Sequence, residues 1–260
     1  MGPPVQLATW NVNSVRARAR HVARFLEERR PDLLVLQELK CEAEGFPALE
    51  FRGLGYHAEL VGQKSYNGVA VLSREPVTVR QRRLPRLREG AAEARYLEFT
   101  AAGITFINIY APNGNSGGDA GFVAKIAFLT SLAERAEALL NEDTPLAIAG
   151  DFNVAPEEID APPGALSPTD ALVRPESRAG FRRLLWLGLT DAVRALQPSG
   201  PAYTFWDYQG AAFDRDVGLR IDHVLLSPTL AEQLVTVEIC RAERAAEQPS
   251  DHVPVMVSLA

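Results

Sequence analysis

Side chains that can take part in catalysis recur in this sequence at the ends of apolar runs. Glu38 directly follows DLLVLQ, and Asp151 and Asn153 close the run LAIAGDFN. Rigid strands that carry polar groups at their ends are a common way to build an active site. The positions that share this property are Asn11, Glu38, Tyr110, Asp151, Asn153, Asp222, Asp251 and His252.

Residues 249–255, PSDHVPV, place Ser250, Asp251 and His252 side by side. These are the residue types of a hydrolase triad, in which the histidine stands between the nucleophile and the carboxylate. Neighbouring residues of an extended chain point to alternating sides, so these three cannot form a triad with one another. If Asp251 and His252 do chemistry, their partners come from elsewhere in the sequence.

Each position taken alone also has a structural explanation. Glu38 could be a loop residue or helix cap, Asp151 and Asn153 could close a turn, and His252 could be a satisfied core histidine. Asp222 is harder to explain in this way, because an ionised carboxylate within an apolar strand is costly to bury without a donor or cationic partner. The recurrence of the pattern along the chain favours a functional site.

The chemistry available to this set is that of phosphodiester hydrolysis. The set holds carboxylates and amides, without cysteine, clustered histidine or a phosphate-binding loop of the GxxxxGK kind. Oxygen ligands select hard cations, so we expect Mg²⁺, or Mn²⁺ in its place. A histidine oriented by an aspartate can move a proton or stabilise a developing phosphorane, and a second aspartate can activate water.

Composition and length are those of a globular domain with a sizeable core: 260 residues, of which 47% are hydrophobic and 23% charged. No segment reaches the roughly 18 apolar residues of a membrane span, and MGPPVQLATW lacks the pattern of a secretory signal. With only Cys41 and Cys240, a disulfide framework is not expected and a cytoplasmic location is. The net charge of −6 decides nothing about nucleic acid, because binding depends on the local field.

Short β-type runs alternate with a few helices along the chain. Residues 155–175 carry five prolines and are expected to form an irregular loop. Without a repeat or linker, we expect one domain over residues 1–260, in which two sheets pack on each other with helices outside. Strands are expected at 5–10, 32–37, 56–62, 68–73, 77–82, 95–102, 105–110, 145–153, 203–206, 218–227, 234–242 and 253–260, and helices at 16–30, 122–141, 178–187, 190–196 and 229–234.

Eight motifs, weak singly but specific in this order, run from one end of the chain to the other. They are WNVNSVRAR (10–18), PDLLVLQELK (31–40), GVAVLS (68–73), NIYAPNG (108–114), AGDFNVAPEEID (149–160), TFWDY (204–208), GLRIDHVLLS (218–227) and SDHVPV (250–255). With them the chain resembles the exonuclease III class of abasic-site (AP) endonucleases, within the endonuclease/exonuclease/phosphatase superfamily. The resemblance implies an α/β (α+β) fold, a four-layered sandwich of two mainly antiparallel sheets between helices.

The same resemblance implies a Mg²⁺-dependent hydrolase of base excision repair. Such an enzyme incises duplex DNA 5′ to abasic sites and processes damaged 3′ ends, and we expect it to act as a monomer, at the nucleoid. The balance among abasic-site incision, 3′→5′ exonuclease, 3′-phosphatase and 3′-phosphodiesterase activity stays open. So does the number of metal ions, one or two.

Metal and water chemistry are assigned by the resemblance as follows. Glu38 would be the principal metal ligand, with Asn11 and Asp251 close to the same ion. Asp151 would orient and activate the attacking water, and Asn153 would hold the scissile phosphate. If a second ion binds, Asp151 and Asn153 are its expected ligands.

Two further roles concern the phosphate itself. Tyr110 would hydrogen-bond the phosphate or assist the leaving group. His252, held by Asp222, would contact a non-bridging phosphate oxygen or act in proton transfer.

For DNA binding, matching positions imply a groove and an apolar pocket for a flipped-out, baseless sugar. Removing the base lowers the cost of extruding the nucleotide, and an apolar slot admits a bare sugar while excluding an intact base. The alternative for the two aromatic positions of the pocket is a place in the core. The groove positions are Arg16, Arg18, Tyr66 and Asn113, and the pocket positions are Phe205, Trp206 and Leu219.

The sequence departs from the family pattern in places. Leu39 stands where relatives usually carry threonine, which affects no expected ligand. Leu219 stands where some relatives have an aromatic pocket residue, so the preference for abasic sites could differ. Ser116 replaces the intercalating arginine of some relatives, and contacts from residues 155–175 cannot be carried over.

Two other functions share parts of this pattern. A phosphatase or lipase-like phosphodiesterase for inositol phosphates or sphingomyelin would share Glu38, Asp151, Asn153 and the SDH motif. The spacing of TFWDY and GLRIDHVLLS and the arginines after Asn11 favour DNA. A non-catalytic nucleic-acid-binding regulator would be expected to have lost ligands that this chain retains.

Overall fold

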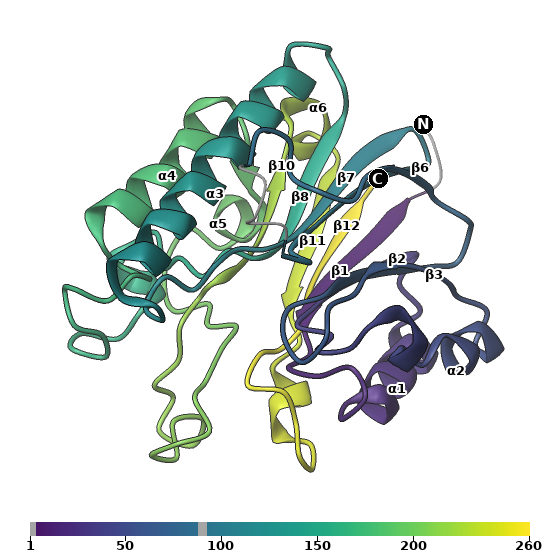
Figure 1. Cartoon of the computed structure of the whole chain (residues 1–260), viewed down its shortest axis with the longest axis horizontal. Helices are drawn as coiled ribbons and strands as arrows, with labels where there is room; N and C mark the ends of the chain where they lie inside the picture. The colour runs from purple at the N-terminus through teal and green to yellow at the C-terminus, as the bar shows by residue number, and fades with distance from the viewer. Residues whose placement is uncertain (1–3, 88–92) are drawn as a thin grey trace.

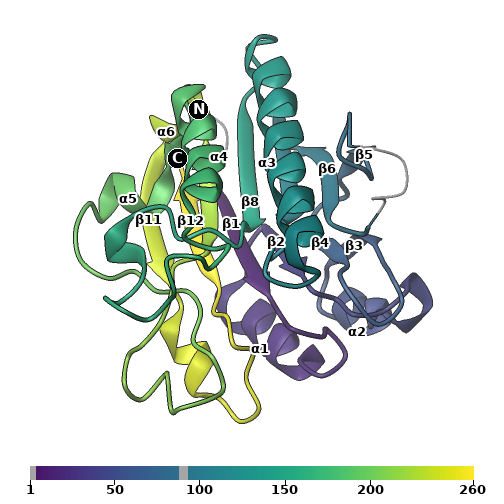
Figure 2. The same ribbon diagram turned by 60° about the vertical axis from the view of Figure 1, so that its left-hand side comes forward.

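Two six-stranded sheets pack face to face and carry helices on their outer sides (Figures 1 and 2). The structure is a computed structural model and describes residues 4–87 and 93–260. Figure 1 shows four layers in succession, with α3 and α4 outside one sheet and α1 and α2 outside the other. The α/β sandwich expected from the sequence is confirmed.

The first sheet has the strand order β11-β12-β1-β2-β4-β3. β1 and β2 pair in parallel, and the other neighbours in this sheet are antiparallel. Its strands are β1 (Val5–Asn11), β2 (Leu33–Gln37), β3 (His57–Val61), β4 (Val69–Ser73), β11 (Leu234–Ile239) and β12 (Val255–Leu259).

The second sheet has the order β5-β6-β7-β8-β10-β9. It repeats the arrangement of the first, with a parallel pair, β7 and β8, among antiparallel neighbours. Its strands are β5 (Thr78–Gln81), β6 (Tyr96–Ala101), β7 (Ile104–Tyr110), β8 (Leu146–Asp151), β9 (Thr190–Asp191) and β10 (Asp222–Leu226).

Most of the helices cover the outer faces of the sheets, and the two short ones at residues 192–196 and 228–231 add to the core between the sheets. On α1, Val22, Phe25 and Leu26 are buried at helical spacing, and Phe25 packs on Trp10 of β1 with ring centroids 5.6 Å apart. The helices are α1 (Ala19–Arg29), α2 (Ala48–Gly53), α3 (Gly118–Leu140), α4 (Pro175–Trp186), α5 (Ala192–Leu196) and α6 (Pro228–Ala231), with 3-10 turns at Ala43–Gly45, Glu158–Asp160 and Arg241–Ala245.

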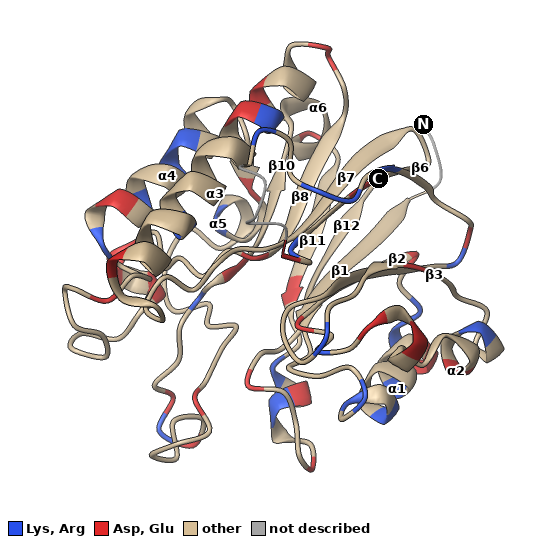
Figure 3. Cartoon of the chain, in the orientation of Figure 1, with Lys and Arg blue, Asp and Glu red and all other residues tan. Residues whose placement is uncertain are grey.

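The period-2 alternation of the strands decides which residues face the other sheet. On β8, Ala147 and Ala149 lie in the core between the sheets, whereas Leu146 and Ile148 face α3 and α4. Both faces are covered, which is why the strand is apolar throughout. Figure 3 shows that the central strands carry little charge, whereas Lys, Arg, Asp and Glu concentrate on helices and loops.

At one end of the sandwich, the rows of residues that face the opposite sheet change from apolar to polar. Parity along each strand places five polar residues in these rows, four of them after the apolar residues of β1, β2, β7 and β8 and one before those of β10. They are Asn11, Gln37, Tyr110, Asp151 and Asp222. Each of these strands thus contributes one polar residue to a common polar region at this end of the sandwich.

The predicted elements differ from the structure in places. No strand forms at residues 203–206, where Phe205 makes single bridges to Leu219 and His252 while Trp206 turns into a separate apolar cluster. The helix expected from residue 122 begins at Gly118, and α2 and β9 were not predicted. Within the described residues, no helix is long and apolar enough to cross a membrane.

A buried polar cluster joins the two sheets next to the polar end. The Nδ2 group of Asn108, on β7, donates to the carbonyl oxygens of Leu36 at 3.0 Å and Ala70 at 2.8 Å. Its Oδ1 accepts from Gln37 Nε2 at 2.8 Å, and Gln37 Nε2 also donates to Thr9 Oγ1 at 3.0 Å. Asn108 is fully buried, so these bonds fix the lateral position of one sheet on the other.

We expect Asn108→Ala to destabilise the fold by about 1–3 kcal/mol, because it leaves the Gln37 amide and two carbonyl groups without their partner inside the core. Urea unfolding followed by circular dichroism measures the change. The control is Asn141→Ala at the exposed end of α3, which should stay within about 0.5 kcal/mol of the parent. Equal effects of the two substitutions would contradict the assignment of this cluster as an inter-sheet contact.

Candidate active site

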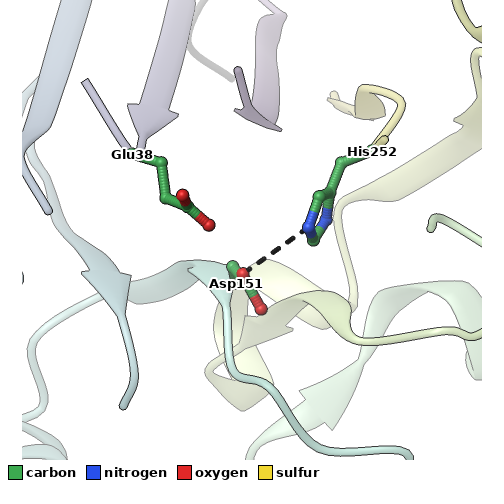
Figure 4. Close-up of side chains that lie close together, drawn as sticks. All are labelled: Glu38, Asp151 and His252. Atoms are coloured by element: carbon green, nitrogen blue, oxygen red, sulfur yellow. Dashed lines mark ion pairs between the residues drawn. The ribbon is translucent and has the colours of Figure 1, made fainter. Parts of the chain in front are cut away.

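The polar end of the sandwich brings Glu38, Asp151 and His252 together from three different strands or strand ends (Figure 4). One ligand atom from each of these side chains lies within 4.8 Å of the others. Glu38 follows β2, Asp151 ends β8, and His252 precedes β12. The three residues, predicted separately from the sequence, therefore face one common space.

Asn11 joins the two carboxylates. Its Nδ2 group donates to Glu38 Oε1 and to Asp151 Oδ2, at 2.9 Å in both cases. Its Oδ1 accepts the backbone N–H of Asn13 at 3.0 Å. Asn11 thus presents its nitrogen, not its oxygen, to the carboxylates, and its role as a metal ligand stays a prediction.

Glu38 is kept ionised by its neighbours. Burial alone would raise its pKa, but the Lys40 ammonium 3.0 Å from Oε2 and the hydrogen bond from Asn11 outweigh burial and hold the pKa below its usual value. Its side chain is partly open to solvent, with 18% exposed. An ionised carboxylate that solvent reaches is suited to binding a divalent cation.

His252 lies between two aspartates. Its Nδ1 is 2.8 Å from Asp222 Oδ2, and its Nε2 is 3.9 Å from Asp151 Oδ2. Thr204 Oγ1 donates to the same Asp222 oxygen at 2.6 Å. Burial alone would lower the pKa of His252, but the charges of Asp222 and Asp151 outweigh burial and raise it well above its usual value. His252 is therefore an imidazolium at neutral pH.

Asp151 is buried, with 1% of its surface exposed. Its pKa is raised because burial disfavours the charged form and because Asp222 and Glu38 are negative, although His252 and Asn11 oppose the shift. Its Oδ1 accepts the backbone N–H of Asn153 at 2.8 Å. A carboxylate with a raised pKa in such a site can accept a proton from water.

Asn153 is held in place from several directions. Its Nδ2 donates to the Ala111 carbonyl at 3.0 Å, and its Oδ1 accepts from Asn113 Nδ2 at 3.0 Å. Its backbone has a φ of 51°, in the left-handed region that asparagine tolerates better than most residues. The structure thus brings the predicted residues Asn113 and Asn153 into direct contact.

Tyr110 faces the same region from β7 and pairs with Asp151 in the parallel register of β7 and β8. Burial raises the pKa of its phenol, and the negative charges of Glu38 and Asp151 raise it further. Arg95 lies over its ring, 4.6 Å from the centroid. Tyr110 therefore stays protonated and can serve as a hydrogen-bond donor.

Asp251 turns to a different set of partners from its neighbour His252. Its Oδ1 accepts from Asn13 Nδ2 at 3.0 Å, and Asn13 Oδ1 in turn accepts from Lys40 Nζ. It is not part of the cluster of three that lies within 4.8 Å, so its place beside the ion stays a prediction. Sequence reasoning missed Asn13 and Lys40, although each lies two residues after a predicted site residue.

The donor set of the site fits a hard divalent cation. Glu38 and Asp151 supply carboxylate oxygens, the ligands that Mg²⁺ and Mn²⁺ prefer. His252 belongs to the same cluster, but its Nδ1 is bonded to Asp222 and its raised pKa favours the protonated ring, which has no free lone pair. The acidic cluster therefore fits a divalent cation by the chemistry of its ligands.

The predicted groove residues differ in whether their side chains are exposed or already bonded to other parts of the protein. Arg16 is exposed, and Tyr66 is 70% exposed, so both can meet a ligand. Arg18 instead links loops of the protein: Nη1 donates to the Asn13 carbonyl at 2.7 Å and Nη2 to the Pro249 carbonyl at 3.0 Å. Tyr208 accepts from Arg18 as well, at 2.9 Å.

The predicted sugar-pocket residues differ in their surroundings. Phe205 is half-buried with its ring 4.9 Å from that of His252, and Leu219 packs in an apolar cluster beside it. Trp206 is 1% exposed, packs with Tyr203 and donates through Nε1 to Asp216 at 3.2 Å. Of the two aromatic residues only Phe205 lies beside the site, and the contact of Trp206 with DNA stays a prediction.

Comparison with known proteins agrees with this geometry. A model of the Endonuclease/Exonuclease/phosphatase family matches residues 8–252. This chain belongs to that family. Exodeoxyribonuclease III of Haemophilus influenzae is 36% identical to it over 96% of this chain and 98% of the relative.

Two solved structures of family members share the fold over almost the whole chain. The 3′ phosphatase NExo from Neisseria, bound to a product DNA hairpin, is 38% identical with a TM-score of 0.92, covering 98% of this chain and 99% of that chain. An AP endonuclease from Archaeoglobus fulgidus is 35% identical with a TM-score of 0.90, covering 97% of this chain and 98% of that chain. The resemblance found in the sequence is confirmed, and with it the assignment to a hydrolytic nuclease family.

The pKa values of two buried histidines, His252 and His223, should be shifted in opposite directions. His252 should stay protonated through neutral pH, because its pKa is raised by Asp222 and Asp151. His223, on the other face of β10, has a pKa lowered to about 4 by burial and by Arg220, and should be neutral. NMR titration of the metal-free protein measures both values.

Asp222→Asn should lower the pKa of His252 and leave that of His223 in place, because only His252 shares a hydrogen bond with Asp222. A His252 that titrates near the value of a free histidine in the parent protein would contradict the assignment.

Proposed function

We propose that this protein is a Mg²⁺-dependent DNA phosphodiesterase that incises duplex DNA 5′ to abasic sites and processes damaged 3′ ends. The observation that carries the proposal is the cluster of Glu38, Asp151 and a charged His252 at one end of the sandwich. The cluster combines a cation site, a base and a positive group, as hydrolysis of a phosphodiester requires. We propose that the protein acts as a monomer, in the cytoplasm at the nucleoid.

In the proposed reaction each residue has a separate task. Asp151 accepts a proton from the attacking water, which its raised pKa favours. His252 donates a hydrogen bond to a non-bridging phosphate oxygen through Nε2, since Nδ1 is held by Asp222. Tyr110, protonated beside Glu38, donates to the phosphate or to the leaving oxygen. Glu38 would hold the Mg²⁺, which when bound would supply Lewis-acid stabilisation of the negative charge on the phosphate.

The choice of DNA over other phosphodiesters is supported by the surroundings of the cluster. Arg16 and Tyr66 are exposed and suited to contacts with a nucleic acid backbone. The Phe205 ring beside His252 offers an apolar surface to a sugar that has lost its base. The relatives named above are a nuclease, a phosphatase solved with DNA and an AP endonuclease.

One assay tests the proposal directly. A duplex with a tetrahydrofuran abasic analogue, and duplexes with a recessed 3′ hydroxyl or a 3′ phosphate, are incubated with Mg²⁺ or with EDTA. We expect nicking 5′ to the analogue and processing of the 3′ ends with Mg²⁺, and neither with EDTA. Turnover of inositol phosphates or sphingomyelin, with all the DNA substrates left intact, would overturn the proposal.

Asp151→Asn should reduce kcat by about 100-fold or more, because the amide cannot accept the proton of the water. Binding of the abasic duplex, measured by fluorescence anisotropy, should change little, since the substitution keeps the shape of the side chain. The matched control is Asp143→Asn, the same substitution at an exposed turn after α3, which should retain full activity. Near-normal turnover by Asp151→Asn would show that another group activates the water.

A further inference from the structure

A buried lysine behind the catalytic loops takes no part in the chemistry described above. Lys125 lies on α3 and is fully buried. Among the described residues, no carboxylate lies within ion-pair distance of its Nζ, which instead donates to two backbone carbonyl groups. The acceptors are the carbonyl oxygens of Asn113, at 3.0 Å, and of Asn153.

Those two carbonyl groups belong to the two asparagines that meet at the site. The Asn113 side chain donates to Asn153 Oδ1 at 3.0 Å, so the residues are joined by their side chains on one side and by Lys125 on the other. Asn113 follows β7 and Asn153 follows β8. Lys125 thus connects the loops that leave the two parallel strands of the second sheet.

The backbone is shaped to fit this side chain. Gly114 has a φ of 89°, and a Cβ built on it would lie 2.8 Å from Lys125 Cδ and 3.0 Å from Ala171 Cβ. The loop after β7 therefore closes on the aliphatic part of Lys125 without room for a side chain. Asn115 extends the contact, donating to Asp170 Oδ1 at 3.1 Å and accepting from the Ala171 N–H at 2.8 Å.

Keeping an ammonium group in this place is costly. Lys125 is fully buried, so a charged form of its amine loses its hydration. An apolar side chain of similar length, such as methionine, would fill the same space without that cost. Packing alone does not explain a lysine here, whereas its bonds to two carbonyl groups do.

We propose that Lys125 is a positioning residue that holds the backbones of Asn113 and Asn153 so that the Asn153 amide faces the phosphate. This inference rests on the proposed function, in which Asn153 binds the scissile phosphate. Lys125 touches neither substrate nor metal and acts through Asn153. The contribution expected of such a supporting contact is about 10- to 100-fold in activity.

Lys125→Met tests the proposal in steady-state kinetics on the abasic duplex. We expect kcat to fall by about 10- to 100-fold, with a much smaller change in KM, because Lys125 is buried and the exposed groove residues Arg16 and Tyr66 are untouched. The control is Leu132→Ala, a fully buried position on the same helix, which should lower the melting temperature at least as much and leave kcat near the parent value. Parent-like kcat in Lys125→Met would overturn the proposal.

A double-mutant cycle separates positioning from a general structural role. If Lys125 acts through Asn153, Lys125→Met should cause little further loss of kcat in an Asn153→Ala background. Multiplicative losses would overturn the proposal. Lys125→Gln, whose shorter amide cannot span both carbonyl oxygens, gives the same test if Lys125→Met does not fold.

The parent enzyme in the same assay distinguishes this proposal from the proposed function. Cleavage of DNA by the parent with parent-like Lys125→Met overturns only the role of Lys125. If the parent instead hydrolyses an inositol phosphate and leaves DNA intact, the proposed function fails. The same cycle is then measured on that phosphate substrate, with the same two outcomes for Lys125.

Discussion

The imidazolium of His252 between Asp222 and Asp151 is the interaction on which the site depends. The two aspartates are direct partners in the antiparallel register of β10 and β8, and both face the opposite sheet. Like charges directly opposite each other on one face of a sheet repel, and here neither is exposed by more than 1%. His252, 2.8 Å from Asp222 and 3.9 Å from Asp151, places a positive charge where that repulsion would otherwise be largest.

The same charge balance explains why the site attracts further cations and donors. Glu38 adds a third carboxylate, whose two oxygens meet Lys40 and the Asn11 amide. When carboxylates outnumber the positive groups around them, a divalent cation stabilises the cluster. The features that make the site costly to fold are thus those that suit it to a metal and to the protons of a phosphodiester reaction.

The backbone at this end of the sandwich contributes to the free-energy cost of forming the site. Asn13, Glu38, Lys40 and Asn153 all have positive φ values, between 44° and 54°. Such conformations cost roughly 1–2 kcal/mol each for most residues, and less for asparagine. They turn the chain sharply at the strand ends, so that side chains point across the gap between the sheets instead of along the strands. Strain of this kind persists where the surrounding core is strong enough to impose it.

Apolar runs that stop in polar residues made much of this arrangement predictable, because a strand covered on both faces is a continuous apolar stretch in the sequence. The ends of β1, β7 and β8 were located in this way, and with them Asn11, Tyr110 and Asp151. β10 begins at Asp222, inside the strand predicted at residues 218–227. Contacts between distant loops leave no such pattern. Arg18 reads as a groove arginine in the sequence, yet its guanidinium binds the carbonyl of Pro249, 231 residues away.

The segment PSDHVPV combines the alternation of an extended chain with contacts to distant parts of the sequence. Ser250 is no nucleophile: its Oγ donates to the Asn11 carbonyl at 2.7 Å and accepts the His252 N–H at 3.2 Å, which ties the turn before β12 to the end of β1. With that turn fixed, the alternation of an extended chain sends Asp251 toward Asn13 and His252 toward Asp222. Adjacent residues can therefore serve two groups of side chains, one with Asn13 and Lys40 and one with Asp222 and Asp151. A triad built from the same three residues would need them on one side, which the backbone forbids.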